Sequence, residues 1–134
     1  MNSHITKEQF VAAKDLIVSS QRILVVAHQD PDGDAVGALL AMANYVRSLG
    51  KDYTLYLYDK PPRYLSFLPG FEEIQTSLPA QQFDLMIAMD YGNFQRLRLG
   101  GFVDGTTKVL TIDHHQLTNH KGAVMLIDKD ADST

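Results

Sequence analysis

Two features common in other classes of protein are missing from this sequence. It contains no cysteine, which excludes disulfide bonds and thiolate metal sites and fits the reducing cytosol. No apolar run approaches the ~20 residues that a membrane-spanning helix needs, and the polar N-terminus, MNSHITKEQF, lacks the apolar centre of a signal peptide. We therefore expect a soluble, cytoplasmic protein.

The sequence also has no excess of basic residues. Its 12 lysines and arginines are outnumbered by 16 aspartates and glutamates, which gives a formal net charge of -4. Non-specific binding to extended duplex nucleic acid needs a large basic surface, so the charge argues against that function. A small phosphorylated substrate needs only a local basic patch and stays compatible with this composition.

The composition that is present is typical of one folded domain: 134 residues, 45% of them hydrophobic. Amphipathic spacing predicts helices over residues 7–19, after a capping box of Thr6 and Gln9, and over residues 35–49, before Gly50. Apolar segments predict strands at residues 22–27, 52–58, 83–89, 108–112 and 123–127. The alternation predicts an α/β fold with a mainly parallel β-sheet flanked by helices on both faces.

Acidic residues and histidines follow three of these predicted strands. In chain order they are His28, Asp32 and Asp34, then Asp90, and finally Asp113, His114 and His115. In open parallel sheets the ligand site lies beyond the carboxyl ends of the strands, so these side chains are expected to meet. Carboxylates this close repel one another unless a cation lies among them. The pattern therefore predicts a metal site.

The donor types indicate which metals fit. Oxygen and imidazole ligands without sulfur suit Mn²⁺ or Mg²⁺, with Zn²⁺, Co²⁺ and Fe²⁺ as alternatives. Several carboxylates imply two cations, and a pair roughly 3.5–4 Å apart can activate a hydroxide for in-line phosphoryl displacement. Asp90 enters alone from the middle of the site and is our candidate for the bridging carboxylate. The positive end of the helix that follows Asp34 favours a bound phosphate group.

Three segments of the chain also resemble the motifs of a known family. HQDPDGDAVG, MDYGNFQRL and IDHHQ are similar, in order, to motifs one to three of the DHH phosphoesterase superfamily. VMLIDKDADST is similar to a later segment of its nanoRNase and 3′-phosphoadenosine-5′-phosphate phosphatase branch. RecJ-type exonucleases and manganese-dependent pyrophosphatases are more distant relatives. The resemblance covers residues 22–134 and implies a DHH-family hydrolase.

The resemblance implies two overlapping sets of metal ligands. His28, Asp32 and Asp90 would hold the first metal, and Asp34, Asp90 and His114 would hold the second. Mn²⁺ would be the cofactor, two ions in a complete site, with Mg²⁺ or Co²⁺ as alternatives.

Three further roles follow from the same resemblance. Asp113 would orient the site from behind the ligands. His115 would contact the scissile phosphate and stabilise charge on the leaving oxygen, which makes Asp90, Asp113 and His115 the candidate catalytic residues. Arg96 would lie at the edge of the substrate pocket and, with His115, bind substrate.

The sequence departs from the family in one respect. Family members supply one more aspartate to the second metal, well downstream of the DHH motif, and carry a second domain with a glycine-rich substrate loop. Neither follows here before Thr134, and three later aspartates come too soon to replace that ligand: Asp128, Asp130 and Asp132. We expect residues 1–134 to be an incomplete N-terminal DHH domain whose second metal is bound weakly or not at all.

The predicted function is metal-dependent hydrolysis of short oligonucleotides or nucleotide bisphosphates. Two alternatives stay open: a manganese-dependent pyrophosphatase or polyphosphatase, and an inert chain that keeps only the fold. Relatives that act on pyrophosphate usually have another residue where Gly33 stands, which favours nucleotides. The expected partner is a short oligonucleotide or nucleotide rather than an extended duplex or a membrane, and a homodimer is compatible with the sequence.

Structural explanations stand beside these functional ones. Asp34 could simply cap a helix, Asp90 could end a strand, and His114 with His115 could be a surface pair. His4 and His120 are expected to be ordinary surface residues. Strand packing accounts more simply than base stacking for three tyrosines: Tyr53, Tyr56 and Tyr58. Five cations are either a local basic rim or scattered charges: Lys60, Arg63, Arg96, Arg98 and Lys121.

Overall fold

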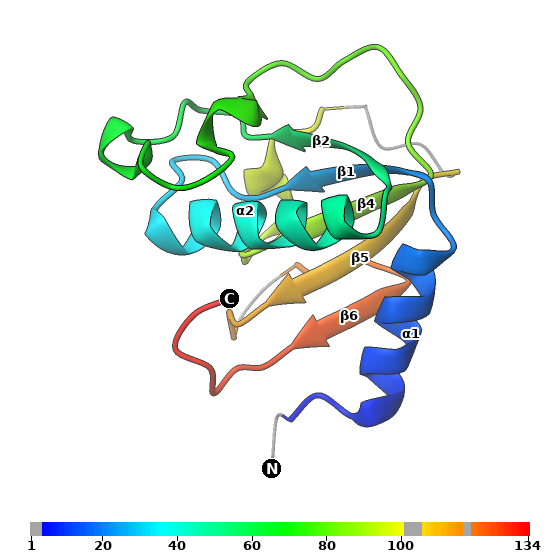
Figure 1. Cartoon of the computed structure of the whole chain (residues 1–134). Helices are drawn as coiled ribbons and strands as arrows, with labels where there is room; N and C mark the ends of the chain where they lie inside the picture. The colour runs from blue at the N-terminus through cyan, green and yellow to red at the C-terminus, as the bar shows by residue number, and fades with distance from the viewer. Residues whose placement is uncertain (1–3, 101–105, 117–118) are drawn as a thin grey trace.

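A single parallel β-sheet organises the molecule (Figure 1). The structure, a computed structural model, describes residues 4–100, 106–116 and 119–134. The six strands are β1 (Arg22–Val26), β2 (Asp52–Tyr56), β3 (Ile74–Gln75), β4 (Leu85–Met89), β5 (Lys108–Asp113) and β6 (Val124–Ile127). They lie in the order β3-β2-β1-β4-β5-β6, and every neighbouring pair is parallel. The predicted α/β class is confirmed.

The helices begin and end close to where the sequence predicts. α1 spans Lys7–Val18 and starts with the complete capping box of Thr6 and Gln9. α2 spans Gly33–Ser48 and is followed by Gly50 at φ 72°, a left-handed conformation that costs glycine little. Three short 3₁₀ helices complete the described secondary structure: η1 (Arg63–Leu65), η2 (Phe71–Glu73) and η3 (Phe94–Leu97).

The two faces of the sheet are covered differently. Ile23 and Ile87 belong to the cluster that α1 and α2 cover, so both α-helices lie on one face (Figure 1). Leu24 and Met86 point to the opposite face, where they pack with Leu97 of η3 and with loop residues. Burial on both faces explains the unbroken apolar sequence of the central strands. None of the described helices is both long and apolar enough to cross a membrane.

Several details of the sheet differ from the prediction; β2, for example, ends at Tyr56 rather than at residue 58. β3 was not predicted, because this strand has two residues and pairs only with Leu55 and Tyr56. β4 begins at Leu85 rather than at residue 83. The Asp84 carboxylate accepts hydrogen bonds from the backbone N–H groups of Gln21 and Arg22, just before β4. None of these differences changes which strands precede the candidate ligands.

The strand order creates the crevice in which the candidate ligands meet. β1 and β4 are neighbours in the sheet, yet the chain leaves β1 toward β2 on one side and continues from β4 to β5 on the other. Connections that diverge in this way leave a crevice beyond the carboxyl ends of the two strands. His28 follows β1 and Asp90 follows β4, so both residues are delivered to this crevice.

The same substitution at two glycines is expected to have opposite effects on stability. A Cβ on Gly122 would lie 3.0 Å from the carbonyl oxygen of Val124 and 3.1 Å from that of Val109, so Gly122→Ala should destabilise by ~1–3 kcal/mol. Gly37 lies within α2 with nothing within 4 Å of its Cβ position, so Gly37→Ala should stabilise by about 0.5–1 kcal/mol. Urea unfolding gives the free energy of unfolding of both variants. Equal changes in the two variants would contradict the close packing around Gly122.

Candidate metal centre

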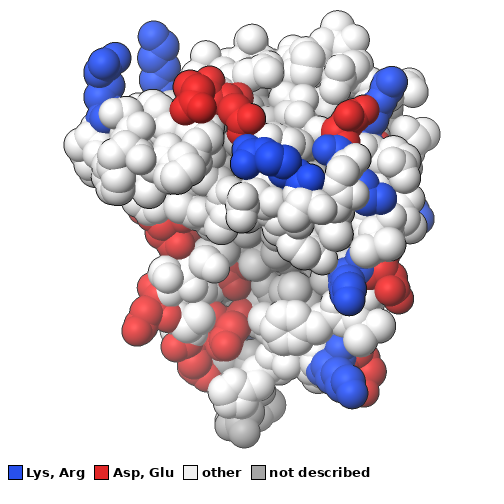
Figure 2. Space-filling model, viewed as in Figure 1, with Lys and Arg blue, Asp and Glu red and all other residues white. Residues whose placement is uncertain are grey.

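The candidate ligands lie together at the carboxyl edge of the sheet. They come from three places: the turn between β1 and α2, the residues after β4, and the residues after β5. Acidic side chains gather along the lower left of Figure 2, on the side toward which the strands run in Figure 1. The donor atoms of His28, Asp32 and Asp90 all lie within 4.8 Å of one another.

Asp90 is the centre of this arrangement. The residue is 1% exposed and adopts φ 51°, a left-handed conformation that side chains other than glycine seldom take. Its backbone N–H donates to the Ile112 carbonyl, which fixes it beside β5. Its two carboxylate oxygens face different neighbours, and Oδ2 is buried with no hydrogen-bond partner among the described residues. A buried carboxylate oxygen left in this state is costly unless a cation binds it.

The first set of donors surrounds Asp90 Oδ2. His28 Nε2 lies 3.5 Å from that oxygen and 3.6 Å from Asp32 Oδ1. Both distances are too long for strong hydrogen bonds, but neighbouring ligands of one cation stand about 3–3.5 Å apart. The same Asp32 oxygen accepts the N–H of Ala35, so this residue caps α2 and is held in place.

The other side of the His28 ring fixes its orientation. Nδ1 contacts the carbonyl oxygen of Gln29, and in the form that donates Nδ1–H there, Nε2 offers a lone pair to the crevice. Burial disfavours a charged ring, but polar contacts with Asp90 and Gln29 outweigh this and raise the pKa of His28. The surroundings of Nε2 therefore favour positive charge, which a metal ion would supply.

The second set of donors surrounds the other oxygen of Asp90. His114 Nε2 lies 3.3 Å from Asp90 Oδ1 and 3.2 Å from Asp34 Oδ2, and its Nδ1 lies 3.2 Å from the carbonyl oxygen of Ala131. The N–H of Thr134 donates to Asp34, and its hydroxyl donates to Asp90 Oδ1. Burial and the charge of Asp90 raise the pKa of Asp34, which the Thr134 N–H opposes.

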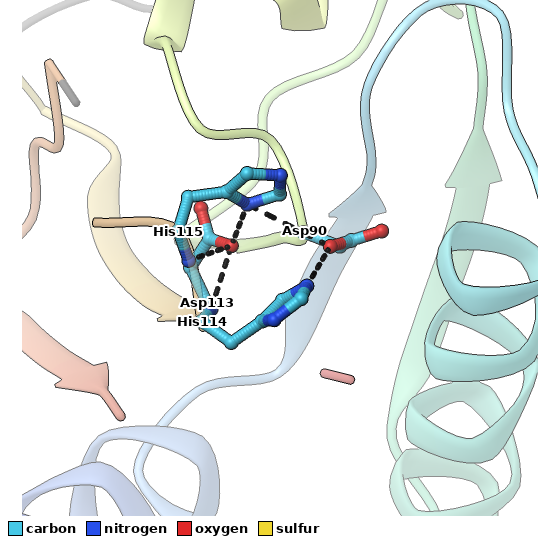
Figure 3. Close-up of side chains that lie close together, drawn as sticks. All are labelled: Asp90, Asp113, His114 and His115. Carbon is cyan, nitrogen blue, oxygen red and sulfur yellow. Dashed lines mark hydrogen bonds and ion pairs between the residues drawn. The ribbon is translucent and has the colours of Figure 1, made fainter. Parts of the chain in front are cut away.

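Asp113 lies behind these ligands and is already saturated with donors (Figure 3). One oxygen accepts the backbone N–H of His114 at 2.8 Å and contacts Nδ1 of His115; the other accepts the N–H of Gly92 at 2.8 Å and of Tyr91 at 3.2 Å. Burial alone would raise the pKa of Asp113, but the bonds from His115 and from the Gly92 N–H outweigh it and lower the pKa to about 2. The geometry is that of a positioning carboxylate.

His115 points its ring into the same region. Its Nδ1 contacts Asp113 and lies 3.8 Å from Asp90 Oδ1 (Figure 3). The ring packs against Gly92, where an added Cβ would lie 3.3 Å from it, and Gly92 has a φ of 68°. A side chain at this position would displace the ring, so the glycine of the MDYGN segment serves the position of His115.

His120 corrects the prediction made from the sequence. It was expected to be an ordinary surface residue, but its side chain is only 10% exposed and Nε2 lies 2.9 Å from Asp113 Oδ2. The ring also makes an edge contact with the buried Tyr91, with centroids 5.2 Å apart. No spacing rule relates positions 113 and 120, because the contact depends on how the loop before β6 returns to the sheet. His120 is thus part of the support of the site.

Arg96 lies beside the first set of donors. Its guanidinium Nη2 is 3.1 Å from His28 Nδ1, and Nη1 donates to the Tyr91 carbonyl oxygen at 3.4 Å. Arg96 belongs to η3, and its backbone carbonyl accepts the N–H of Gln29. The structure thus brings together every predicted site residue, with Arg96 at the rim.

The donor set suits a divalent cation. Each oxygen of Asp90 faces one imidazole nitrogen, and that nitrogen lies beside the carboxylate of Asp32 or Asp34. Oδ2 of Asp90 has no hydrogen-bond partner among the described residues. Hard oxygen donors with imidazole are the combination that Mn²⁺ and related ions accept.

Comparison with known proteins agrees with this arrangement. The family model described as "DHH family, N-terminal domain" matches residues 22–134. The bifunctional oligoribonuclease and PAP phosphatase NrnA of Thermus thermophilus is 35% identical over 109 residues, which are 79% of this chain and 32% of that protein. A probable manganese-dependent inorganic pyrophosphatase of Streptococcus mutans is 30% identical over 107 residues, which are 76% of this chain and 34% of that protein.

A solved structure supports the fold. An exopolyphosphatase-related protein from Bacteroides fragilis superposes with a TM-score of 0.88 at 20% identity, over 96% of this chain and 41% of that one. The chain spans about a third of the length of the curated relatives it matches.

The stability contributed by Asp113 should depend on pH. Folding lowers its pKa from 3.8 to about 2, so the ionised carboxylate stabilises the fold above about pH 4 and ceases to do so as the pH falls to about 2. Asp113→Asn should cost on the order of 1–2 kcal/mol at neutral pH, and the difference from wild type should shrink in acid. Denaturant unfolding in EDTA measures this; a difference that stays constant down to about pH 2 would contradict the assignment.

Metal binding should depend on Asp90 and not on the nearby Asp30. Both aspartates have a left-handed backbone, with φ 51° and 50°, and asparagine tolerates that conformation, so Asp→Asn is a matched change at the two positions. Asp90→Asn removes the charge that both donor sets share and should weaken Mn²⁺ binding by ~100-fold or more, as isothermal titration calorimetry would measure. Asp30→Asn, at an exposed position, should leave binding unchanged. An equal loss of Mn²⁺ affinity in the two variants would show that binding depends on the overall negative charge and not on Asp90 itself.

Proposed function

This chain belongs to the DHH family, and from that premise we propose that it is the metal-binding domain of a phosphoesterase that hydrolyses short oligonucleotides or nucleotide bisphosphates. The observation that carries the proposal is the position of Asp90, whose two oxygens each face a separate set of imidazole and carboxylate donors. The 35% identity to a bifunctional oligoribonuclease and PAP phosphatase supports the substrate class.

In the proposed site of the whole protein, each set of donors would hold one Mn²⁺ ion. His28, Asp32 and Asp90 bind the first ion, and Asp34, Asp90 and His114 bind the second. When bound, such a pair supplies the activation of a water nucleophile and the stabilisation of charge on the phosphoryl oxygens. The name of the pyrophosphatase relative, which is manganese-dependent, supports the choice of ion.

The residues behind the ligands set the geometry of the reaction. Asp113 fixes the ring of His115 through Nδ1, which leaves Nε2 on the opposite side of the ring. In the protonated ring, Nε2–H is a donor that can stabilise the negative charge developing on the leaving oxygen. Asp113 also holds the backbone of Tyr91 and Gly92, and through them the position of Asp90.

Positive charge around the crevice suits a phosphate group. α2 begins at Gly33, directly beside the ligands Asp32 and Asp34, and its N-terminal dipole end faces the site. Arg96 adds a guanidinium at the rim of the first donor set. We assign Arg96 to the edge of the substrate pocket on this ground.

Pyrophosphate or polyphosphate is the second candidate substrate. The 30% identity to a probable manganese-dependent pyrophosphatase is the observation that favours it. A substrate panel with Mn²⁺ distinguishes the two, using a ribodinucleotide, 3′-phosphoadenosine 5′-phosphate and pyrophosphate. The proposal expects the two nucleotide substrates to be hydrolysed at least ~10-fold faster than pyrophosphate at equal concentration. The reverse order would replace the nucleotide assignment.

Activity should depend on Asp90 in the full-length protein. Asp90→Asn should lower kcat/KM for the preferred substrate by ~100-fold or more, because it removes the anionic oxygens that both donor sets share. Steady-state hydrolysis with saturating Mn²⁺ measures this, with Asp30→Asn as the matched control. If Asp90→Asn retains about a tenth or more of wild-type activity, the bridging role is wrong.

A further inference from the structure

A cavity of about 660 Å³ lies outside the metal centre. Among the residues that line it are Tyr58, Phe94, Arg98, Leu99, Val109 and Lys121. Phe94, Leu99 and Val109 also pack in the cluster on the face of the sheet opposite α1 and α2. A volume of this order accommodates a small organic ligand, and nothing in the proposed reaction uses the cavity.

Each of the two cations at the cavity lies over an aromatic ring. The guanidinium carbon of Arg98 is 4.9 Å from the centroid of the Tyr58 ring, and Nζ of Lys121 is 5.2 Å from that of the Phe94 ring. Contacts of this kind hold a cation in place without neutralising it. Each cation therefore covers one face of its ring, and the cavity presents the two charges together with the uncovered parts of the two rings.

Among the described residues, no carboxylate forms an ion pair with Arg98 or Lys121. In the described part of the chain, the Arg47–Glu73 pair is the one ion pair between a lysine or arginine and a carboxylate, and none of the described residues that line the cavity is acidic. The chain as a whole carries a net charge of -4. Because the protein as a whole is acidic, the positive charge at this cavity attracts an anion to the cavity and not to the surface in general.

The backbone of Arg98 is held in an unusual conformation at this place. Arg98 follows η3 with φ 54°, a left-handed conformation that costs of order 1 kcal/mol or more for such a residue. The hydroxyl of Tyr56 donates to its carbonyl oxygen at 3.3 Å. In the same short helix, Arg96 contacts His28 of the metal centre while Phe94 lines the cavity. η3 thus lies between the acidic metal centre and the cavity that carries the two cations.

We propose that this cavity binds a nucleoside monophosphate at a site separate from the metal centre. The base contacts the parts of the Tyr58 and Phe94 rings that the two cations leave uncovered, and the phosphate pairs with Arg98 and Lys121. Aromatic faces accept any base, and paired cations beside them accept its phosphate. The site does not depend on the proposed catalytic function, because none of these four residues belongs to the metal donor sets.

Adenosine 5′-monophosphate is the probe that tests the site, added to the 134-residue chain in EDTA and followed by ¹H–¹⁵N NMR. We expect saturable binding with a Kd between ~10 μM and ~1 mM, at least ~10-fold tighter than for adenosine or for ribose 5-phosphate alone. The largest shifts should fall on Tyr58, Phe94, Arg98 and Lys121. No saturable binding up to about 5 mM, or shifts centred on His28 and His114, would overturn the proposal.

Variants separate this cavity from general charge and from the metal centre. Arg98→Gln and Lys121→Gln should each weaken binding of adenosine 5′-monophosphate by ~5-fold or more, and so should Phe94→Leu, with circular dichroism confirming that each variant is folded. Arg63→Gln, at an exposed position outside the cavity, and Asp90→Asn should leave the Kd within about two-fold of wild type. Equal weakening by Arg63→Gln, or loss of binding in Asp90→Asn, would overturn the assignment.

Discussion

One buried carboxylate determines how the rest of the site is built. Asp90 is 1% exposed, has a left-handed backbone, and presents one oxygen to His28 and the other to His114. Burying such a group is expensive unless opposite charge binds it. The sheet supplies the burial, because β4 lies between β1 and β5 and places Asp90 between the turns that carry the two histidines. A cation beside Oδ2, which has no hydrogen-bond partner among the described residues, would offset the cost that the fold creates.

A second carboxylate gives this centre its rigidity. Asp113 accepts backbone N–H groups from the turn after β4 and from its own turn after β5, together with side-chain contacts from His115 and His120. A cluster of this kind ties two neighbouring strand ends into one unit. The ligands therefore do not rely on the metal alone for their positions, and the orientation of His115 follows from the same bonds.

The parts of the molecule that could be predicted from the sequence are those governed by local periodicity. Buried parallel strands read as unbroken apolar segments, and the capping box of Thr6 and Gln9 marks the start of α1. The strand-end acids and histidines could be predicted to lie together, because parallel strands deliver them to one edge. β3 has too few residues to leave a pattern. Arg98 and Tyr58 are far apart in sequence, and His120 follows Asp113 by seven positions without lying in a helix, so no spacing rule reveals either contact.

The most direct test of the central claim is the anomalous diffraction of crystals grown with Mn²⁺. If a cation stabilises the buried Asp90 carboxylate, an anomalous peak should lie about 2.0–2.3 Å from His28 Nε2 and from Asp90 Oδ2. Asp32 should belong to the same coordination shell. An ordered His28, Asp32 and Asp90 at saturating Mn²⁺ with no peak between them would contradict the account.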